Sequence, residues 1–284
     1  MKKTVLMTGS SGFIGRHVKK KLKSHGFDLI ENSRSKIEKK NTIYSHLDLS
    51  DLTSIRKIFE ENKIDVVIHL GTKVGFNKNI SELFVENVMA TKLIADLAFK
   101  QNSFLIFASG TIVYNSNIEF VDDQTKPDPD NSYGKSKLLA ENYIIESGVR
   151  YSIHRISGVF GYNGPTHLSL NNSIMMALNN KQLKLINNNN VQRNYIYVKD
   201  IAEIIYKTVI EDINGIHIVA GEEIKTFEEM IIDINSILNP KLQPKIIKGL
   251  QSSKTQIYEH SKNLPKPTGF IESLKDIKMD YLKK

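Results

Sequence analysis

The chain has 284 residues, enough for one large domain or for a domain with a smaller lobe. Apolar residues make up 40% of it, and the absence of cysteine excludes a disulfide framework, a thiolate zinc site and a cysteine nucleophile. The net charge of +8 suits either a polyanion or a phosphorylated small molecule and does not decide between them. No apolar run approaches the roughly 18–20 residues of a membrane-spanning helix. The apolar start breaks at residues 8–12, too early for a signal peptide, so we expect a cytoplasmic protein with no membrane partner.

Short apolar runs alternate with amphipathic stretches through the first half of the chain. Helices are predicted at residues 12–25, 52–62, 81–100 and 133–146. Strands are predicted at residues 4–7, 27–32, 42–47, 66–68, 104–108 and 151–156. This alternation predicts an α/β fold with a Rossmann-type, doubly wound parallel sheet and helices on both faces.

The pattern loosens after about residue 160. Helices are predicted at residues 169–179, 201–210, 227–238 and 271–282, and short strands at 195–198 and 215–220. We expect an NAD(P)-binding Rossmann domain over residues 1–160, to which residues 191–220 return. A smaller C-terminal α/β lobe, over residues 161–190 and 221–284, is expected to bind the substrate.

A glycine-rich turn joins the first predicted strand to the first predicted helix. Gly9 suits a tight turn, Gly12 lets the backbone approach a pyrophosphate, and Gly15 permits close packing of helix on strand. The amides and the positive dipole end of the helix favour an anion. We therefore predict that a dinucleotide binds to Gly9, Ser11, Gly12, Phe13, Ile14 and Gly15.

The Gly-x-x-Gly-x-x-Gly spacing after a threonine resembles that of the extended short-chain dehydrogenase/reductase (NAD-dependent epimerase/dehydratase) family. The resemblance covers almost the whole chain and includes residues 47–49 and 65–71. It implies a nicotinamide cofactor, a nucleotide-diphosphate sugar substrate and a homodimer formed through residues 81–100 and 133–146. It also implies cofactor contacts from Asp48, Leu49, Leu70, Gly71, Thr72 and Ile156.

The end of the second predicted strand bears on the choice between NAD and NADP. An acidic residue there would bind the ribose 2′-hydroxyl, whereas an arginine would favour a 2′-phosphate. Ser33 and Arg34 occupy this place, and Glu31 lies too early in the strand to reach the ribose. NADP is therefore the favoured cofactor, with NAD as the alternative.

Tyr133 and Lys137 are four residues apart and share one face of a predicted helix. An ammonium near a phenol favours the phenolate and lowers its pKa from about 10. The resemblance assigns Tyr133 the role of general acid or base. It assigns Lys137 the binding of the nicotinamide ribose and the tuning of Tyr133, so that both residues also contact the cofactor.

Two positions depart from the family's pattern. The family places a catalytic Ser or Thr hydroxyl after the fifth strand, where this chain has Gly110. Ser109 and Thr111 flank it, and a small backbone shift would bring in either hydroxyl, Thr111 being slightly favoured. Gly158 stands where the resemblance implies an Asn that meets the sugar. Either the site is roomier than in relatives, or neighbouring side chains have taken over.

The resemblance also points to substrate contacts. Arg193 matches an arginine that binds the nucleotide diphosphate, which suits bidentate guanidinium–phosphate pairing, and a surface salt bridge is the alternative. Lys73, Thr111 and Tyr133 are further expected contacts, as is His167 in a predicted loop. The eight histidines show no metal-ligand spacing, so no metal is expected.

The reaction can be narrowed by residue type. Ile112 and Val113 stand where the family's sugar 4,6-dehydratases carry an Asp-Glu pair, which argues against dehydration. The epimerase–reductases that make fucose nucleotides need a cysteine, which this chain lacks. Reduction of a nucleotide 4-keto-(deoxy)sugar by NADPH is favoured by Ser33, Arg34 and the short chain. The alternatives are NAD(P)-dependent epimerisation through transient oxidation at C4, and a non-catalytic NADP- or RNA-binding protein.

Overall fold

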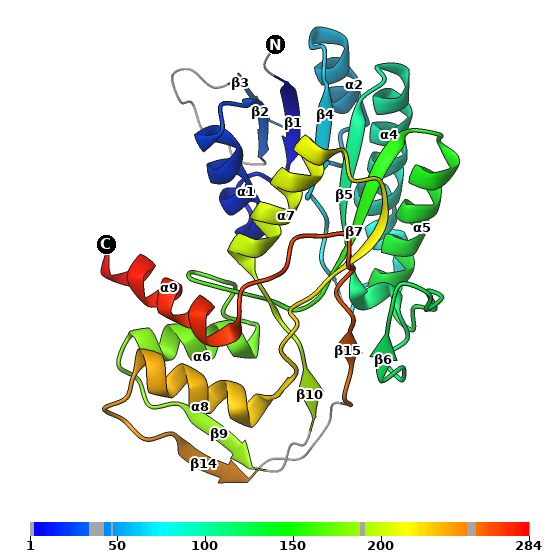
Figure 1. The fold of residues 1–284 in the computed structure, drawn as a ribbon. Helices are drawn as coiled ribbons and strands as arrows, with labels where there is room; N and C mark the ends of the chain where they lie inside the picture. Colours follow the sequence, from blue (N-terminus) through cyan, green and yellow to red (C-terminus); the bar gives the residue numbers. More distant parts are fainter. Residues whose placement is uncertain are drawn as a thin grey trace. The chain divides into compact units, whose positions relative to one another are not determined.

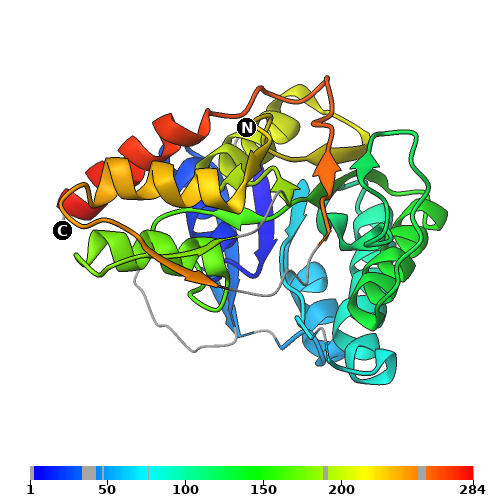
Figure 2. The same ribbon diagram turned by 90° about the horizontal axis from the view of Figure 1, so that it is seen from below.

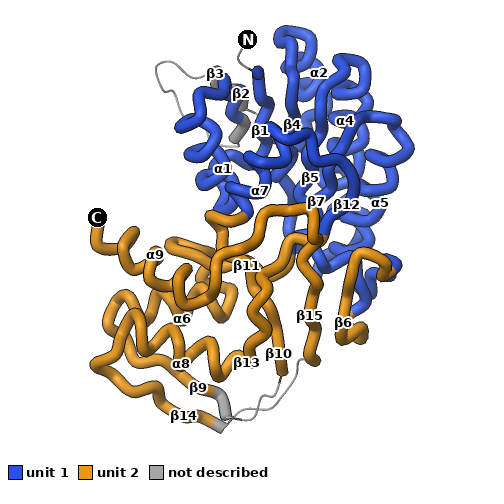
Figure 3. Tube along the Cα trace, viewed as in Figure 1, with its two compact units in different colours: residues 1–115, 126–156, 201–217 blue, residues 116–125, 157–200, 218–284 orange. Residues whose placement is uncertain are grey.

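The computed structural model describes residues 3–33, 43–46, 48–75, 77–187, 191–248 and 254–283, and gives the backbone alone at residues 32–33, 43–46, 186–187 and 248. The chain forms two compact units, drawn in blue and orange in Figure 3. Unit 1 comprises residues 1–115, 126–156 and 201–217. Unit 2 comprises residues 116–125, 157–200 and 218–284.

A seven-stranded sheet is the framework of unit 1 (Figure 1). The six strands from β7 to β3 pair in parallel. The chain starts at β1 in the middle, proceeds to one edge through β2 and β3, and returns through β4 to the other edge. This confirms the predicted doubly wound topology. The strand order is β12 (Gly215–Val219), β7 (Arg150–Ile156), β5 (Phe104–Gly110), β4 (Val66–His69), β1 (Thr4–Thr8), β2 (Asp28–Ser33) and β3 (Ile43–His46).

Helices cover both faces of this sheet (Figure 1). Because side chains alternate along a strand, Leu6, Val67 and Leu105 point to one face, where they join the main apolar core. The helices α2 (Leu52–Glu61), α4 (Ala90–Lys100) and α5 (Ser132–Glu146) supply much of the rest of that core. The other face is covered by α1 (Phe13–Ser24) and α7 (Val198–Glu211).

The helix predicted over residues 81–100 is present but not uniform. It consists of α3 (Ile80–Leu83), a π-helical segment η1 (Phe84–Met89) and then α4. A π-helical turn shifts the register by one residue, so the faces before and after η1 are not those of one continuous α-helix. A short 3₁₀ segment, η2 (Thr111–Val113), follows β5 directly.

Unit 2 contains three helices and four small strand pairs in its described residues. The helices α6 (Ser169–Leu178), α8 (Phe227–Leu238) and α9 (Phe270–Leu282) lie side by side in both Figure 1 and Figure 2. The strand pairs are β10 (Gln192–Arg193) with β13 (Lys225–Thr226), β11 (Ile196–Tyr197) with β8 (Val159–Phe160), β9 (Lys184–Asn187) with β14 (Lys245–Lys248), and β6 (Phe120–Val121) with β15 (Ile257–Tyr258).

The two units differ from the predicted domain limits in four segments, residues 116–125, 157–160, 191–200 and 218–220, all of which belong to unit 2. Residues 191–200 belong to unit 2, because β10 and β11 pair with β13 and β8. Residues 116–125 also belong to unit 2, because β6 pairs with β15 from the far end of the chain. None of the helices in the described ranges is long and apolar enough to cross a membrane.

Candidate active site

The turn between β1 and α1 has no room for side chains at two of its glycines. Gly9 has a positive φ of 68°, and a Cβ there would lie 2.8 Å from the amide nitrogen of Gly71. A Cβ at Gly15 would lie 2.1 Å from the carbonyl oxygen of Gly9. The amide of Gly12 donates to the same carbonyl at 3.0 Å, which closes the turn. The result is a bare backbone at a helix N-terminus, which fits a pyrophosphate group.

Other predicted cofactor residues lie around this turn. Ser11 and Gly12 are exposed, while Phe13 and Ile14 are half-buried at the start of α1. Gly71 follows β4, and a Cβ on it would lie 2.9 Å from Cδ1 of Leu49. The remaining predicted contacts are Asp48, beside Leu49; Leu70 and Thr72, on either side of Gly71; and Ile156, at the end of β7.

The choice between NAD and NADP depends on the end of β2. Ser33 is the last residue of β2, and only its backbone is described, whereas Arg34 lies outside the described residues. Glu31 is fully buried and forms ion pairs with Lys19, at 3.0 Å, and with Lys23. Burial raises the pKa of Glu31, but the two ammonium groups lower it by more than burial raises it. The pKa of Glu31 therefore lies below its usual value. This carboxylate is therefore already engaged by α1.

Tyr133 stands in the first turn of α5 and forms a side-chain hydrogen bond with Thr72. Burial raises the pKa of Tyr133, and the hydrogen bond with Thr72 only partly offsets it. This differs from the predicted lowering by Lys137. The physical reason is that loss of hydration penalises the phenolate, and the Lys137 ammonium binds elsewhere.

Lys137 lies one turn further along α5 and is only 2% exposed. Its Nζ donates to the carbonyl oxygen of Ala108 at 2.7 Å and lies 4.0 Å from the ring centre of Phe107. Burial lowers the pKa of Lys137 to about 7, although the charge of Glu141 acts to raise it. Near neutral pH, this ammonium is thus poised between its charged and neutral forms.

Asn87, in the π-helical segment η1, connects the loop after β4 to α5. Its Oδ1 accepts from Thr72 Oγ1 at 3.0 Å and from the amide of Lys73 at 2.8 Å. Its Nδ2 donates to Ser136 Oγ at 3.1 Å, and Ser136 donates to the carbonyl of Tyr133. Asn87 therefore holds Thr72 and the first turn of α5 together.

The two candidate hydroxyls, Ser109 near the end of β5 and Thr111 directly after it, have different surroundings. Ser109 Oγ donates to the buried carboxylate of Glu141 and is therefore engaged. Thr111, in η2, is nearly buried, and no hydrogen bond among the described residues uses its hydroxyl. At Gly110 a Cβ would be no closer than 3.5 Å to Ile112, so one added methyl group would fit there in ordinary van der Waals contact. Thr111 is thus the hydroxyl that the surrounding protein leaves available.

The predicted substrate residues are distributed over both units. In unit 1, Lys73 forms an ion pair with Glu86. In unit 2, Arg193 lies on β10 and is half-buried, and its guanidinium donates to the carbonyl of Gln192 at 2.9 Å. Within the described ranges Arg193 forms no ion pair, so the surface salt bridge considered from the sequence is not found. His167 is exposed in the segment before α6.

Several residues of the site were not predicted. Glu141 was detectable, because Tyr133, Lys137 and Glu141 recur at intervals of four and so follow one face of α5. Asn87 could not be detected from the sequence, because its position depends on the π-helical turn, which has no sequence signature of its own. Gly158 lies against the ring of Tyr195, so there a neighbouring side chain has taken over the space.

Comparison with known proteins agrees with this geometry. Residues 5–221 match the model of the NAD dependent epimerase/dehydratase family. The chain belongs to this family. Among curated members, a UDP-N-acetyl-alpha-D-glucosaminuronate decarboxylase from Bacillus cytotoxicus is 27% identical over 266 residues, which cover 84% of this chain and 81% of that protein.

Solved structures share the fold over nearly the full length of the chain. The UDP-N-acetylglucosamine 4-epimerase from Bacillus cereus superposes with a TM-score of 0.85 and 23% identity, covering 99% of this chain and 100% of that one. The dTDP-4-dehydrorhamnose reductase from Yersinia enterocolitica gives a TM-score of 0.80 and 19% identity, with coverage of 99% and 100%. At these identities the likeness is one of fold.

Proposed function

We propose that this family member catalyses the NADPH-dependent reduction of a nucleotide 4-keto-(deoxy)sugar, with Tyr133 as the general acid. The observation that carries the proposal is the phenol of Tyr133, hydrogen-bonded to Thr72 and one helical turn from the buried Lys137. A phenol whose pKa burial has raised is protonated at neutral pH and suits the donation of a proton to a substrate oxygen.

The cofactor would be held by the residues around the β1–α1 turn. When bound, a nicotinamide cofactor supplies the hydride. The bare backbone at Gly9, Gly12 and Gly15 fits its pyrophosphate, and Lys137 would bind its nicotinamide ribose. NADP is preferred over NAD in this proposal, because Glu31 is engaged by Lys19 and Lys23 and is not available to a ribose 2′-hydroxyl.

Two further residues would bind the substrate. Thr111 would hold the keto oxygen beside Tyr133, since its hydroxyl has no partner among the described residues. Arg193 would bind the nucleotide diphosphate, because its guanidinium lacks a carboxylate partner in the described part of unit 2. His167 and Lys73 are weaker candidates, since His167 is exposed and Lys73 already pairs with Glu86.

NAD(P)-dependent epimerisation at C4 is the second candidate. A 4-keto sugar that is to receive hydride on its other face must turn over within the site, and that movement requires space. Gly110 stands where the family's pattern implies a Ser or Thr, and a Cβ there would be in ordinary van der Waals contact with Ile112 at 3.5 Å, so the glycine leaves about one methyl group of extra room, which favours this reaction. The same residues would act, with Tyr133 first accepting and then returning a proton.

The test is a turnover assay with a panel of nucleotide 4-keto sugars and either NADPH or NADH, followed at the nicotinamide absorbance band. We expect NADPH consumption that Tyr133→Phe reduces at least about 10²-fold, the low end of general acid–base contributions. Tyr143→Phe, a change in the same helix outside the described network, is the matched control and should keep wild-type turnover.

Each outcome of this assay leads to one interpretation. Net NADPH consumption identifies the reductase and its preferred sugar. Interconversion of 4-hydroxy sugars, followed by NMR without net cofactor consumption, identifies the epimerase. Neither activity, together with salt-sensitive RNA binding, would support the non-catalytic alternative.

A homodimer is part of the same proposal. Apolar side chains on η1, α4 and α5 are exposed, with Val85 43%, Phe99 54% and Ile145 41% accessible. Exposed apolar side chains on neighbouring helices are typical of a protein–protein interface. Light scattering on the purified protein should give twice the mass of the chain, and Phe99→Glu should reduce it to that of a monomer.

A further inference from the structure

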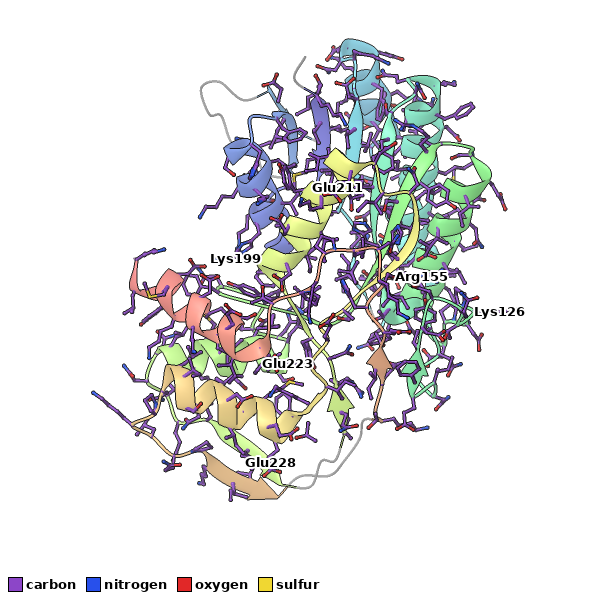
Figure 4. All side chains as sticks on the ribbon, viewed as in Figure 1. Lys126, Arg155, Lys199, Glu211, Glu223 and Glu228 are labelled. Carbon is purple, nitrogen blue, oxygen red and sulfur yellow. The ribbon has the colours of Figure 1, made fainter. Side chains whose placement is uncertain are left out.

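A buried carboxylate, Glu141, lies behind the catalytic pair of α5. It is fully inaccessible to solvent and accepts hydrogen bonds from Ser109 Oγ and from the guanidinium of Arg155, with Nη2 at 2.6 Å and Nε at 3.2 Å. Arg155, labelled on β7 in Figure 4, also donates to the hydroxyl of Tyr114 at 2.8 Å. Ser109, Arg155 and Tyr114 thus fix the carboxylate in one position.

This carboxylate is linked to Lys137 in two ways. Glu141 follows Lys137 by one turn of α5, so the two side chains share a helix face. Its partner Ser109 is next in the chain to Ala108, whose carbonyl accepts the Lys137 ammonium at 2.7 Å. Glu141 therefore braces both the strand end that receives the ammonium and the helix that carries it.

The charge on Lys137 depends on few groups. Its burial favours the neutral amine, and the Glu141 charge opposes this. His69 on β4 is electrostatically coupled to it but is buried, with a pKa lowered to about 3, and so stays neutral. The nearby Phe107 ring carries no net charge. Within the described ranges, Glu141 is thus the carboxylate that acts on Lys137, with Arg155 as its own counter-ion.

We propose that Glu141 is a positioning residue that keeps Lys137 charged and directed at the carbonyl of Ala108, with Ser109 and Arg155 fixing the carboxylate. This rests on the proposed function, in which a charged Lys137 binds the nicotinamide ribose. It reassigns Ser109 from a candidate catalytic hydroxyl to a support of Glu141. Arg155 acts on Lys137 only indirectly, through its hydrogen bonds to Glu141.

The experiment measures NADPH binding by nicotinamide fluorescence between pH 6 and 10 on the full chain, with NADH in parallel. Affinity should fall as pH rises and Lys137 loses its proton. In Glu141→Gln the midpoint of this fall should move to lower pH by about one unit. This is the low end of the pKa shift expected when a nearby opposite charge is removed. Ser109→Ala, which keeps the charge, should leave the midpoint within a few tenths of a unit of wild type.

A second variant guards against misfolding, because Glu141→Gln leaves Arg155 buried without a carboxylate. Glu141→Gln with Arg155→Gln restores a neutral hydrogen-bonding pair and should give a midpoint between those of wild type and Glu141→Gln. A merely structural role predicts the wild-type midpoint in every variant that folds, and that result would overturn the proposal. So would failure of both variants to fold, which would make the carboxylate a folding element.

Failure of the proposed function has a different signature. If the wild-type protein binds neither NADPH nor NADH at any pH, the cofactor assignment itself is wrong. If it binds one of them with an affinity that does not depend on pH while Tyr133→Phe abolishes turnover, the function stands and the role of Glu141 is wrong.

Discussion

The ring of Tyr195 occupies the space into which a side chain at position 158 would project. A Cβ at Gly158 would lie 2.5 Å from two carbons of that ring, whereas one at Gly110 would meet nothing closer than 3.5 Å. Of the two glycines that depart from the family's pattern, Gly158 has its side-chain space filled by a neighbour, whereas Gly110 is open to one added methyl group in ordinary van der Waals contact. A neighbouring side chain has therefore taken over the space at Gly158.

This difference predicts how an added methyl group will act. Gly158→Ala should lower the free energy of unfolding by about 1–3 kcal/mol, because the Tyr195 ring must move. Gly110→Ala is the matched control and should change it by less than about 0.5 kcal/mol. Urea denaturation measures both. In a Tyr195→Ala background, Gly158→Ala should cause no further loss of unfolding free energy. Equal losses of unfolding free energy in Gly158→Ala and Gly110→Ala would contradict the packing argument.

The glycines of the β1–α1 turn should also differ from one another. A Cβ would lie 2.1 Å from the Gly9 carbonyl when placed at Gly15, but 3.2 Å from it when placed at Gly12. We expect Gly15→Ala to cost about 3 kcal/mol of unfolding free energy and to abolish NADPH binding. Gly12→Ala should lower the unfolding free energy by clearly less than Gly15→Ala does. Thermal denaturation with a fluorescence titration tests this, and a milder Gly15→Ala would speak against close packing of α1 on this turn.

Substitutions of Ser109 and Thr111 should have different effects, with Thr111 affecting turnover and Ser109 affecting stability. Thr111→Val should lower kcat by about 10²-fold, the scale of one lost hydrogen-bond donor at a reacting oxygen. Ser109→Ala should mainly lower stability, by about 1–3 kcal/mol, since Glu141 loses a buried partner. Because a Cβ fits at Gly110 at ordinary contact distances, Gly110→Ser in the Thr111→Val protein should restore part of the activity. A larger kcat loss in Ser109→Ala would reverse the assignment.

A buried histidine gives the stability a pH dependence. His69 bridges Thr8, at 2.6 Å, and Thr91, at 2.9 Å; burial and then the charge of Lys137 lower its pKa to about 3. Between about pH 6.5 and 3 the unfolded chain binds a proton there and the folded chain does not. The free energy of unfolding should therefore fall on acidification by up to about 1.4 kcal/mol per pH unit.

The matched variant for this prediction is His69→Gln, which keeps a hydrogen-bonding side chain and does not titrate. Denaturant unfolding of both proteins at pH 7 and pH 5 isolates the contribution of His69. The difference in unfolding free energy between wild type and variant should shrink as pH falls. A difference that stays constant would mean that the pKa of His69 is the same in the folded and the unfolded states.

Local spacing determined the parallel sheet of unit 1 and the helix that carries Tyr133 and Lys137. The alternation of apolar runs with amphipathic stretches placed every strand of the parallel sheet and the helices around it, because periods of two and 3.6 residues are fixed by backbone geometry. In the same way, the interval of four residues put Tyr133 and Lys137 on one face of α5. These features depend only on residues close together in the chain.

Residues far apart in the chain decided the rest. The strands β6 and β15 exist only as partners of each other, so neither has a pattern of its own. The π-helical turn that aims Asn87 at Thr72 is stabilised by contacts that the sequence period does not encode. The direction of the Tyr133 pKa shift likewise came from burial and not from its spacing to Lys137.

The sequence by itself therefore determined the fold, the glycine-rich turn between β1 and α1, and the residue types proposed to act on the substrate. Only the tertiary structure decided which hydroxyl is available, because Ser109 is engaged by Glu141 and Thr111 has no partner among the described residues. It alone also separated the filled Gly158 from the open Gly110. The physical reason is that hydrogen-bond partners, burial and free space belong to side chains brought together by folding, whereas periodicity belongs to the backbone.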